Sequence, residues 1–207
     1  MIKVTLLTAV MMSAFFSTAQ DTTKSKKINE YYMGVSNIVP LEISLKYKRQ
    51  LKNNTFFKIG LVDLSAKAST DMPESTSKFS TENYSISAGL ELGLEFRKQV
   101  TEKFTFFHGP NLGFSYRVQT STMNDPSIPI GFKERKLQDY VASIPYTFGL
   151  LFQLNSNFFL STEINPGLFA SFSEIDNGSN SNTNFKNTTA GFKLSNNNSL
   201  LSIGYRL

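Results

Sequence analysis

The stretch YSISAGLELGLEFRKQVTEKFTFFHGPNLGFSYRVQ, residues 84–119, decides the fold of this protein. From residue 84 to residue 97, large apolar side chains occupy every second position, and Ser, Gly, Glu and Arg lie between them. After the TEK segment, 101–103, the alternation resumes as far as residue 118, with Phe107 as an apolar exception on the polar face. A period of two puts apolar residues on one face of a strand and polar residues on the other. The stretch therefore predicts two long antiparallel strands joined by a tight turn.

The rest of the chain repeats this alternation. It is strong in 140–154, 160–172 and 201–207, and weaker in 41–48 and 55–66. In 55–66 the parity is mixed at Val62 and Asp63. With residues 31–37 counted as the first strand, the chain has eight strands.

The connections between these strands fall into two kinds. Tight connections occupy 51–54, 101–103 and 155–157, and long polar ones occupy 67–82, 120–137 and 174–198. Barrels of bacterial outer membranes keep short turns in the periplasm and long loops outside. Counting the segment NTTAGFKLS, 187–195, in place of 31–37 also gives eight strands, but it reverses the two sides. We therefore expect 174–198 to be one long loop.

Strand length and side-chain size favour a transmembrane barrel over a soluble sandwich. The expected strands of about 14 to 17 residues exceed the 9–11 residues that cross a bilayer at a tilt. Aromatic residues also lie near both ends of the strands, as interfacial girdles require, although the chain has no Trp. Seven glycines fall on the polar face: Gly89, Gly93, Gly109, Gly113, Gly149, Gly167 and Gly204.

Glycines on the polar face leave room for larger polar side chains inside a narrow eight-stranded barrel. The sequence predicts a polar network in the lumen, formed by Glu91, Glu95, Arg97, Asn111, Arg117 and Glu163. A pair of acidic residues acting as a catalytic centre is the alternative interpretation of the three glutamates. Because arginines are interleaved with them, we interpret the set as a charge-neutralising core.

Three prolines, Pro110, Pro145 and Pro166, fall within the expected strands. Proline removes a hydrogen bond from the ladder, and a closed barrel has no free edge where that loss is harmless. We therefore expect β-bulges at these positions.

The N-terminus has the composition of an export signal. Lys3, an apolar run over 4–16 and the small residues Ser17 and Ala19 precede Gln20. This pattern predicts a signal peptide over 1–19, cleaved between Ala19 and Gln20. Residues 20–29 then form a short periplasmic tail, and 30–207 form the barrel.

The segments AGLELGLEFRKQ, HGPNLGFSYR and LLSIGYRL give residues 30–207 a resemblance to small outer-membrane β-barrel proteins of the OmpA and OmpX kind, known as the outer membrane protein beta-barrel domain. The resemblance implies an all-β, eight-stranded antiparallel transmembrane barrel in the outer membrane of a Gram-negative cell. It also implies contact with outer-membrane lipid and insertion by the barrel-assembly machinery. Family members often end in Phe, whereas this chain ends in Leu207, two residues after Tyr205.

Few residues offer catalytic or metal-binding chemistry. The chain has no Cys, and its one histidine, His108, falls on the apolar face beside Phe106, where we interpret it as an interfacial residue. We expect no enzymatic activity, no cofactor and no metal. The modest net charge of +5 is spread along the chain, which argues against a nucleic-acid partner. Lys133, Arg135 and Lys136 are candidate contacts for lipopolysaccharide phosphates, with a solvated strand extension as the alternative.

These features predict a structural, adhesive or interaction role through the extracellular loops, with a lumen too narrow for a wide pore. The alternative is a soluble periplasmic binder like the lipocalins, in which the apolar face points inward. The sequence does not identify an extracellular partner.

Overall fold

The computed structural model describes residues 27–38, 41–71, 80–124, 134–177, 185–193 and 200–207. The expected signal peptide, its cleavage site at Ala19 and Gln20, and Lys133 lie outside the described residues. Within them, no helix is long and apolar enough to cross a membrane. The strands are β1 (Asn29–Ile38), β2 (Leu41–Lys52), β3 (Thr55–Asp71), β4 (Ser80–Gln99), β5 (Phe104–Asn124), β6 (Glu134–Gln153), β7 (Phe158–Ile164), β8 (Gly167–Asp176), β9 (Phe185–Lys193) and β10 (Leu200–Arg206).

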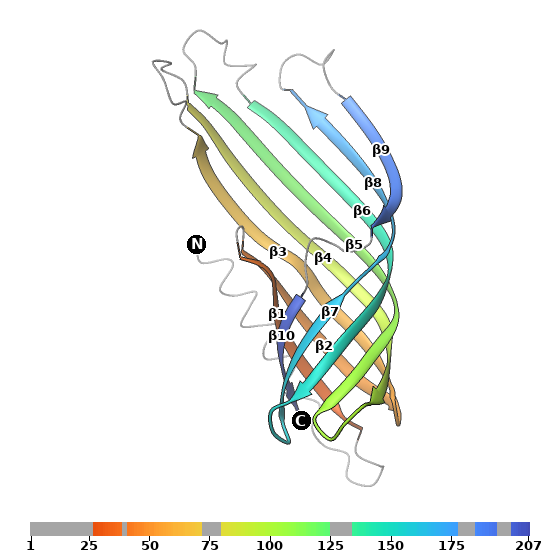
Figure 1. Ribbon diagram of the computed structural model, residues 1–207. Coiled ribbons are helices and arrows are strands. Elements are labelled where there is room, and N and C mark those ends of the chain that lie inside the picture. The colour runs from red at the N-terminus through yellow and green to blue at the C-terminus, as the bar shows by residue number, and fades with distance from the viewer. Residues whose placement is uncertain (1–26, 39–40, 72–79, 125–133, 178–184, 194–199) are drawn as a thin grey trace.

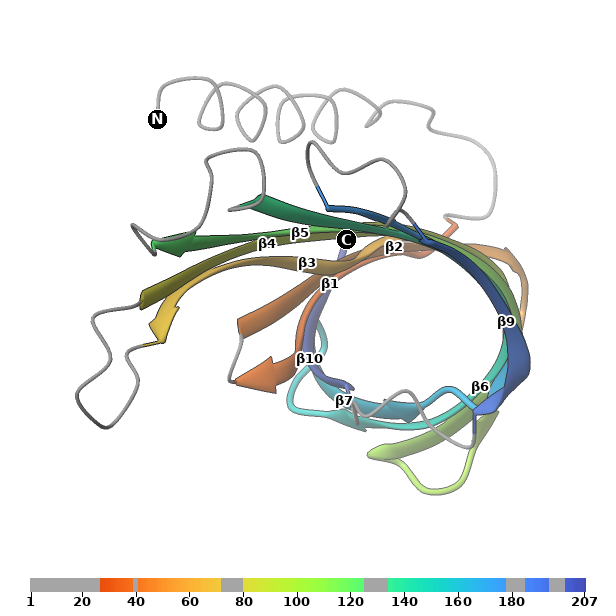
Figure 2. The same ribbon diagram turned by 90° about the horizontal axis from the view of Figure 1, so that it is seen from above.

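Eight of these strands close into a ring. Each strand from β1 to β6 pairs antiparallel with the next, and β10 pairs with both β7 and β1. Viewed from above, these strands form a ring (Figure 2). Two-residue alternation over long segments thus produces the expected all-β, eight-stranded antiparallel barrel, and this prediction is confirmed. The short connections at 53–54, 100–103 and 154–157 lie at one end, here called the turn end, together with residue 207.

The barrel wall is taller on one side than on the other. Strands β3, β4, β5, β6, β8 and β9 pair in that order and continue beyond the short β1–β2 hairpin (Figure 1). We call this part the projecting sheet: residues 64–71 of β3, 80–88 of β4, 115–124 of β5 and 134–143 of β6, with all of β8 and β9. Its outer edges are formed by β3 on one side and β9 on the other.

Strands β7 and β8 form one interrupted strand along β6. Both keep the same register, since Phe148 pairs with Ile164 and Pro145 with Gly167. Among the described strands, β9 pairs with β8 alone, above the point where β10 pairs with β7. Residues 185–193 are therefore a strand of the projecting sheet, and the expectation that 174–198 is one long loop is wrong.

The other two expected loops are also shorter than predicted. Strands β4, β5 and β6 have 20, 21 and 20 residues, so strand structure extends into both 67–82 and 120–137. These extensions are rich in Ser, Thr, Asn and Gln, and they lack the apolar alternation that identified the strands below. Neighbouring strands nevertheless supply backbone hydrogen bonds along them, which is sufficient for sheet structure.

The mixed parity at Val62 and Asp63 marks a β-bulge. The register between β3 and β4 shifts between Val62 and Ser65, and Asp63 has a φ of 54°. Asp is one of the few residues that adopt the left-handed conformation at modest cost. The bulge moves the alternation of β3 back into phase, so that the serines above it face inward with those of β4.

The prolines are accommodated without the expected bulges. Pro110 and Pro145 lie in the β5–β6 ladder, which shows no register shift. Pro166 lies between β7 and β8, where its carbonyl accepts a hydrogen bond of 2.7 Å from the Tyr146 N–H. Gly167 lies against the Pro145 backbone, and a Cβ there would overlap it. The ladder tolerates these prolines by interrupting a few bridges, and the prediction of bulges is wrong.

Candidate functional sites in the lumen and the projecting sheet

The lumen near the turn end contains a buried network of charges centred on Glu30. The Arg97 guanidinium donates to both Glu30 carboxylate oxygens, at 2.9 and 2.5 Å, and Arg206 donates to Oε1 at 2.7 and 2.9 Å. Arg97 also pairs with Glu95 at 2.6 Å, and Lys48 pairs with the same carboxylate at 2.6 Å. Glu30 is 0% exposed, so these contacts replace all of its hydration.

A second network lies above the first. Lys58 contacts Glu91 at 2.7 Å, and Lys46 forms ion pairs with both Glu91 and Glu163. These side chains come from β2, β3, β4 and β7, so the network ties opposite walls of the ring together. Beside it, Asn111 donates to the Thr147 hydroxyl at 2.5 Å.

Aromatic side chains fill the space around the buried charges. Phe107 and Phe159 are 0% and 1% exposed, and Tyr32 and Leu151 join them in one buried cluster. The Lys48 ammonium lies 4.2 Å from the Tyr32 ring centre and 4.7 Å from that of Phe107, within cation–π range. Phe107, the apolar exception in the sequence, therefore points inward and packs over Gly149, where a Cβ would collide with its ring. The lumen of the ring is a packed core.

The predicted polar network is only partly assembled. Glu91, Glu95, Asn111 and Glu163 are buried in the ring, and the Arg97 side chain is 8% exposed between Glu30 and Glu95. Arg117, in contrast, is exposed in the projecting sheet and is not part of the buried network. The prediction that Arg117 belongs to the lumen network is therefore wrong. Arg117 lies on the inner face of β5, but this face continues above the closed ring, and Arg117 lies in that upper part.

Sequence reasoning missed four buried charges, Glu30, Lys46, Lys48 and Lys58. Lys46 and Lys48 alternate with Leu45 and Tyr47, so their parity already indicated the polar face. Their pairing with carboxylates on other strands was not visible, because it depends on how the ring closes.

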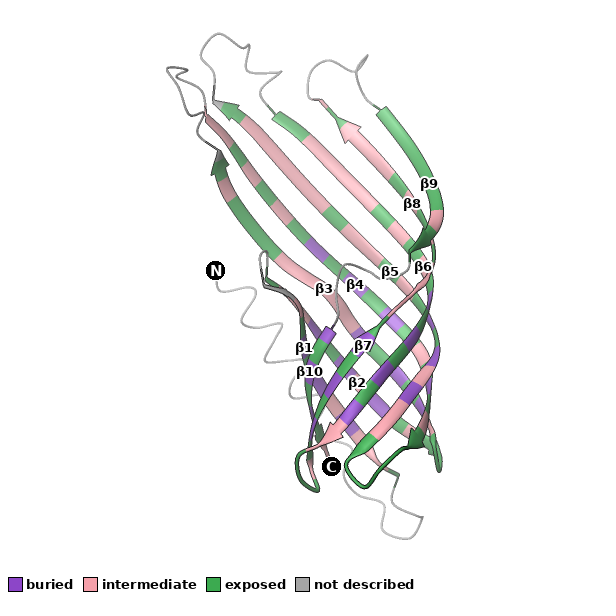
Figure 3. Cartoon of the chain, viewed as in Figure 1, coloured by how far each residue is buried: buried purple, intermediate pink, exposed green. Residues whose placement is uncertain are grey.

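Two hollows lie on the inner face above the networks. The lower one has a volume of about 60 Å³ and is lined by Ser44, Lys46, Asp63, Glu91 and Glu163 among others. The upper one, here called the groove, has a volume of about 440 Å³. It lies on β2, β3, β4 and β5, and its lining residues are Glu42, Ser65, Lys67, Ser69, Asn83, Ser85, Arg117 and Gln119. Burial decreases from the ring to the projecting sheet (Figure 3), so the groove is open to its surroundings.

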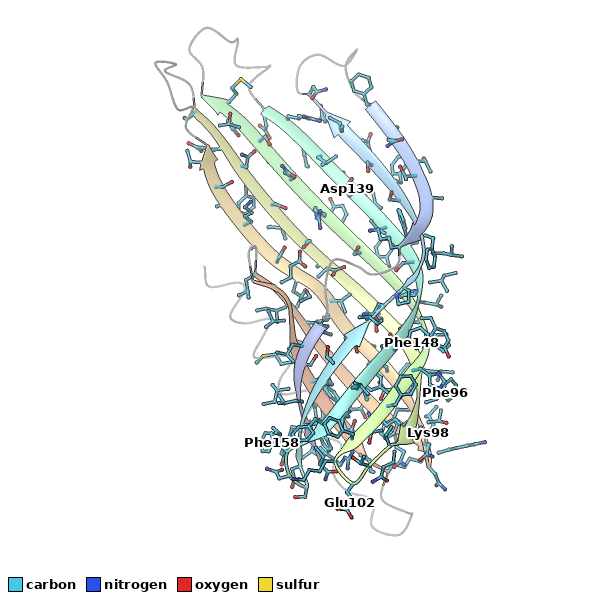
Figure 4. All side chains as sticks on the ribbon, viewed as in Figure 1. Phe96, Lys98, Glu102, Asp139, Phe148 and Phe158 are labelled. Carbon is cyan, nitrogen blue, oxygen red and sulfur yellow. The ribbon has the colours of Figure 1, made fainter. Side chains whose placement is uncertain are left out.

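The outer face of the barrel is apolar. Large hydrophobic side chains on every strand of the ring are exposed there, including Leu92, Leu112, Ile144 and Leu201. Figure 4 shows the two ends of the barrel: Phe158 lies at the turn end, and Asp139 lies in the upper part of β6, in the projecting sheet.

Two groups of aromatic contacts border this surface. Near the turn end, the ring centres of Phe104 and Phe152 lie 4.9 Å apart, and those of Phe158 and Tyr205 lie 5.1 Å apart. Towards the loop end, Tyr116 and Tyr140 lie 4.8 Å apart, and Phe172 continues the row. This is the arrangement of two interfacial girdles around an apolar band.

His108 lies within the aromatic outer surface. Its Nδ1 is 2.7 Å from the Tyr146 hydroxyl, and its ring stacks on that of Tyr146 at 5.9 Å. Phe96 and Phe106 flank the histidine on the same face. Nowhere in the described ranges do three His, Asp or Glu side chains come together as metal ligands.

The candidate lipopolysaccharide contacts that the structure describes lie at the start of β6. Arg135 is exposed and Lys136 is partly exposed. Consecutive residues of a strand point to opposite faces, so Lys136 lies on the outer face with Tyr140, and Arg135 lies on the inner face. The two cations therefore cannot bind one phosphate together, as a contiguous cluster would.

Comparisons with known proteins agree with this architecture. No family model and no curated protein matches the chain. Among solved structures, a major outer membrane protein from Thermus thermophilus is similar over 88% of this chain and 100% of its own, with 12% identity and a TM-score of 0.50. The chain described here has the fold of a small outer-membrane β-barrel.

Other solved barrels align over similar lengths with lower scores. Ail, the attachment invasion locus protein of Yersinia pestis, was solved with the heparin analogue sucrose octasulfate. It is 13% identical over 87% of this chain and 97% of its own, with a TM-score of 0.39. CarO of Acinetobacter baumannii is 10% identical over 87% of this chain and 96% of its own, with a TM-score of 0.34.

Proposed function

We propose that this chain is an integral outer-membrane barrel that serves a structural, adhesive or interaction role through its projecting sheet and loops, without enzymatic activity and without a wide pore. The observation that carries the proposal is the inversion of the usual arrangement of a soluble protein. Lysine and glutamate side chains such as Lys58 and Glu95 are buried inside, while leucines such as Leu92 are exposed outside. Such a surface is stable in lipid and would aggregate in water.

The soluble lipocalin-like alternative requires the opposite arrangement. Its interior would be apolar and hollow, with room for a small ligand. Here the ring interior contains two ion-pair networks and the Phe107 cluster, and the lower hollow directly above them has a volume of about 60 Å³. This interior favours the membrane barrel over the binder.

Spin labelling separates the two proposals directly. The chain has no cysteine, so Leu92→Cys and Glu102→Cys each provide a single labelling site. In bilayers, a label at position 92 should be accessible to oxygen, which partitions into lipid, and a label at 102, in a tight turn, should be accessible to a water-soluble nickel complex. If label 92 is shielded from both quenchers, the outer face is not in contact with lipid.

Export and membrane contacts complete the proposal. We infer that residues 1–19 are removed at Ala19–Gln20, which mass spectrometry of the mature N-terminus tests, and that the barrel-assembly machinery inserts the chain. Lys136 is the described cation that supports a contact with anionic headgroups, since it shares the outer face with the upper aromatic row. Resistance to carbonate extraction and a heat-modifiable band on SDS gels are expected, and recovery as a fully soluble periplasmic protein would contradict the assignment.

A further inference from the structure

The inner face of the projecting sheet carries an ordered array of polar side chains. Cross-strand pairing places Ser65 beside Ser87 and Ser87 beside Arg117, and in the next row it places Lys67 beside Ser85 and Ser85 beside Gln119. All of these residues except Ser87 line the groove, which has a volume of about 440 Å³. The array therefore extends over three adjacent strands of one sheet, β3, β4 and β5.

Two cations of the groove lie outside the ion pairs of the described residues, although the charge of Arg117 acts on the Asp63 carboxylate and Glu42 lies in the same lining. Within the described part of the chain, neither Lys67 nor Arg117 makes an ion pair, although Asp139 is the Cα partner of Arg117 on β6. From the spacing of strands and residues, their Cα atoms lie roughly 12 Å apart. Two long side chains at that separation can converge on one anion between them. The cations of the ring below, such as Lys48 and Lys58, are by contrast paired with carboxylates.

The neutral lining of the groove is suited to hydroxyl groups. Ser65, Ser69 and Ser85 can each donate and accept a hydrogen bond, as can the amides of Asn83 and Gln119. Part of this lining is fixed in advance, because the Ser121 hydroxyl donates to Asn83 at 2.7 Å and Ser65 and Ser87 share a hydrogen bond of 2.8 Å. Glu42 is the carboxylate of the lining, and Ser36 donates to it at 3.4 Å. Its position at the top of β2 disfavours an anion at that end of the groove.

We propose that the groove binds a phosphate carried on a sugar, with the phosphate between Lys67 and Arg117 and the sugar hydroxyls on the serine and amide side chains. A phosphate monoester carries up to two negative charges and offers three acceptor oxygens, which matches one ammonium and one guanidinium fork. The proposal rests on the proposed function, because it assigns the projecting sheet to the outside of the cell. Two sources share this chemistry, namely a soluble sugar phosphate and the phosphorylated sugar headgroup of lipopolysaccharide.

Titration of the purified barrel in detergent micelles with glucose 1-phosphate tests the site. Saturable NMR shifts should occur at the backbone amides of Ser85 and Gln119, and glucose alone should produce much weaker ones. The double variant Lys67→Gln, Arg117→Gln should bind roughly tenfold more weakly or worse, since it loses two charge-assisted contacts. Lys98→Gln, at the other end of β4, is the matched control and should bind as the wild type does.

The outcomes separate the site from its biological source. Displacement of glucose 1-phosphate by lipopolysaccharide assigns the groove to a lipid headgroup, and failure of displacement assigns it to a soluble sugar phosphate. Equal binding by the double variant, equal shifts with glucose or the absence of saturation would each overturn the proposal. Because Lys67 and Arg117 are exposed, the double variant should retain the heat-modifiable band that shows folding. A negative titration of a protein that still resists carbonate extraction rejects the groove and leaves the membrane assignment intact.

Discussion

Glu30 is the residue on which the lower ion-pair network depends. It accepts hydrogen bonds from Arg97, Arg206 and the Tyr32 hydroxyl while being fully buried. We predict that Glu30→Ala lowers the free energy of unfolding by about 3 to 5 kcal/mol, because it leaves two guanidiniums without their shared partner. Urea titration followed by the heat-dependent gel shift measures the change. The control is Lys186→Ala, which breaks an exposed pair with Glu174 and should cost about 1 kcal/mol or less. Equal costs for the two variants would show that the network contributes little.

Leu92 and Ser87 test the two faces of the same strand. Leu92 is exposed on the outer face, so Leu92→Arg should cost about 2 to 4 kcal/mol in a bilayer. Ser87 is buried on the inner face, and its hydroxyl donates to the Asp63 carbonyl at 2.6 Å. Ser87→Ala should cost about 1 to 2 kcal/mol, because it removes this hydrogen bond and the one that Ser87 shares with Ser65. A smaller cost for Leu92→Arg than for Ser87→Ala, in the same unfolding assay, would reverse the assignment of faces.

Among the elements, the interrupted strand β7–β8 depends on a close approach of backbones. A Cβ at Gly167 would overlap backbone atoms of Pro145 and the Ile144 carbonyl, which cannot move without disturbing β6. We predict that Gly167→Ala destabilises the protein by about 1 to 3 kcal/mol. Gly191 on β9 is the matched control, because a Cβ there meets only the Phe169 ring, at 3.1 Å, and that side chain can rotate. If both variants unfold at the same urea concentration, the backbones around Gly167 have room to separate.

At the scale of the whole molecule, ring closure and filling of the lumen determine permeability. Eight strands leave an interior just wide enough for side chains, and the ion pairs and aromatic residues occupy it. We predict that the purified protein shows no large stable conductance in planar bilayers. Both networks would have to separate to open a path, so moderate voltage should not produce one. A wide, stable pore would mean that the ring rearranges in lipid.

Alternation along the sequence determined the strands of the ring and their faces. Residues 84–97 and 140–154 could be assigned to strands because one face of each meets the outer surface and the other meets the interior of the ring. Mixed parity at Val62 and Asp63 showed where the alternation of β3 is interrupted. Burial of Glu91, Glu95 and Glu163 followed from the same parity. These properties are local, since a period of two is readable within one strand.

Only the tertiary structure decided which strands meet and where they end. The partners of Glu163 and Glu30 are Lys46 and Arg97, which lie 117 and 67 residues away along the chain, so they depend on the tilt and closure of the ring. The upper parts of β4 and β5 and the whole of β9 are polar on too many positions for alternation to be visible, yet neighbouring strands hold them in the sheet. Arg117 has the parity of the lumen residues but lies above the closed ring. Parity specifies only the face of a strand on which a residue lies. The height at which the ring ends is set by the short β1–β2 hairpin, which is a property of the tertiary structure.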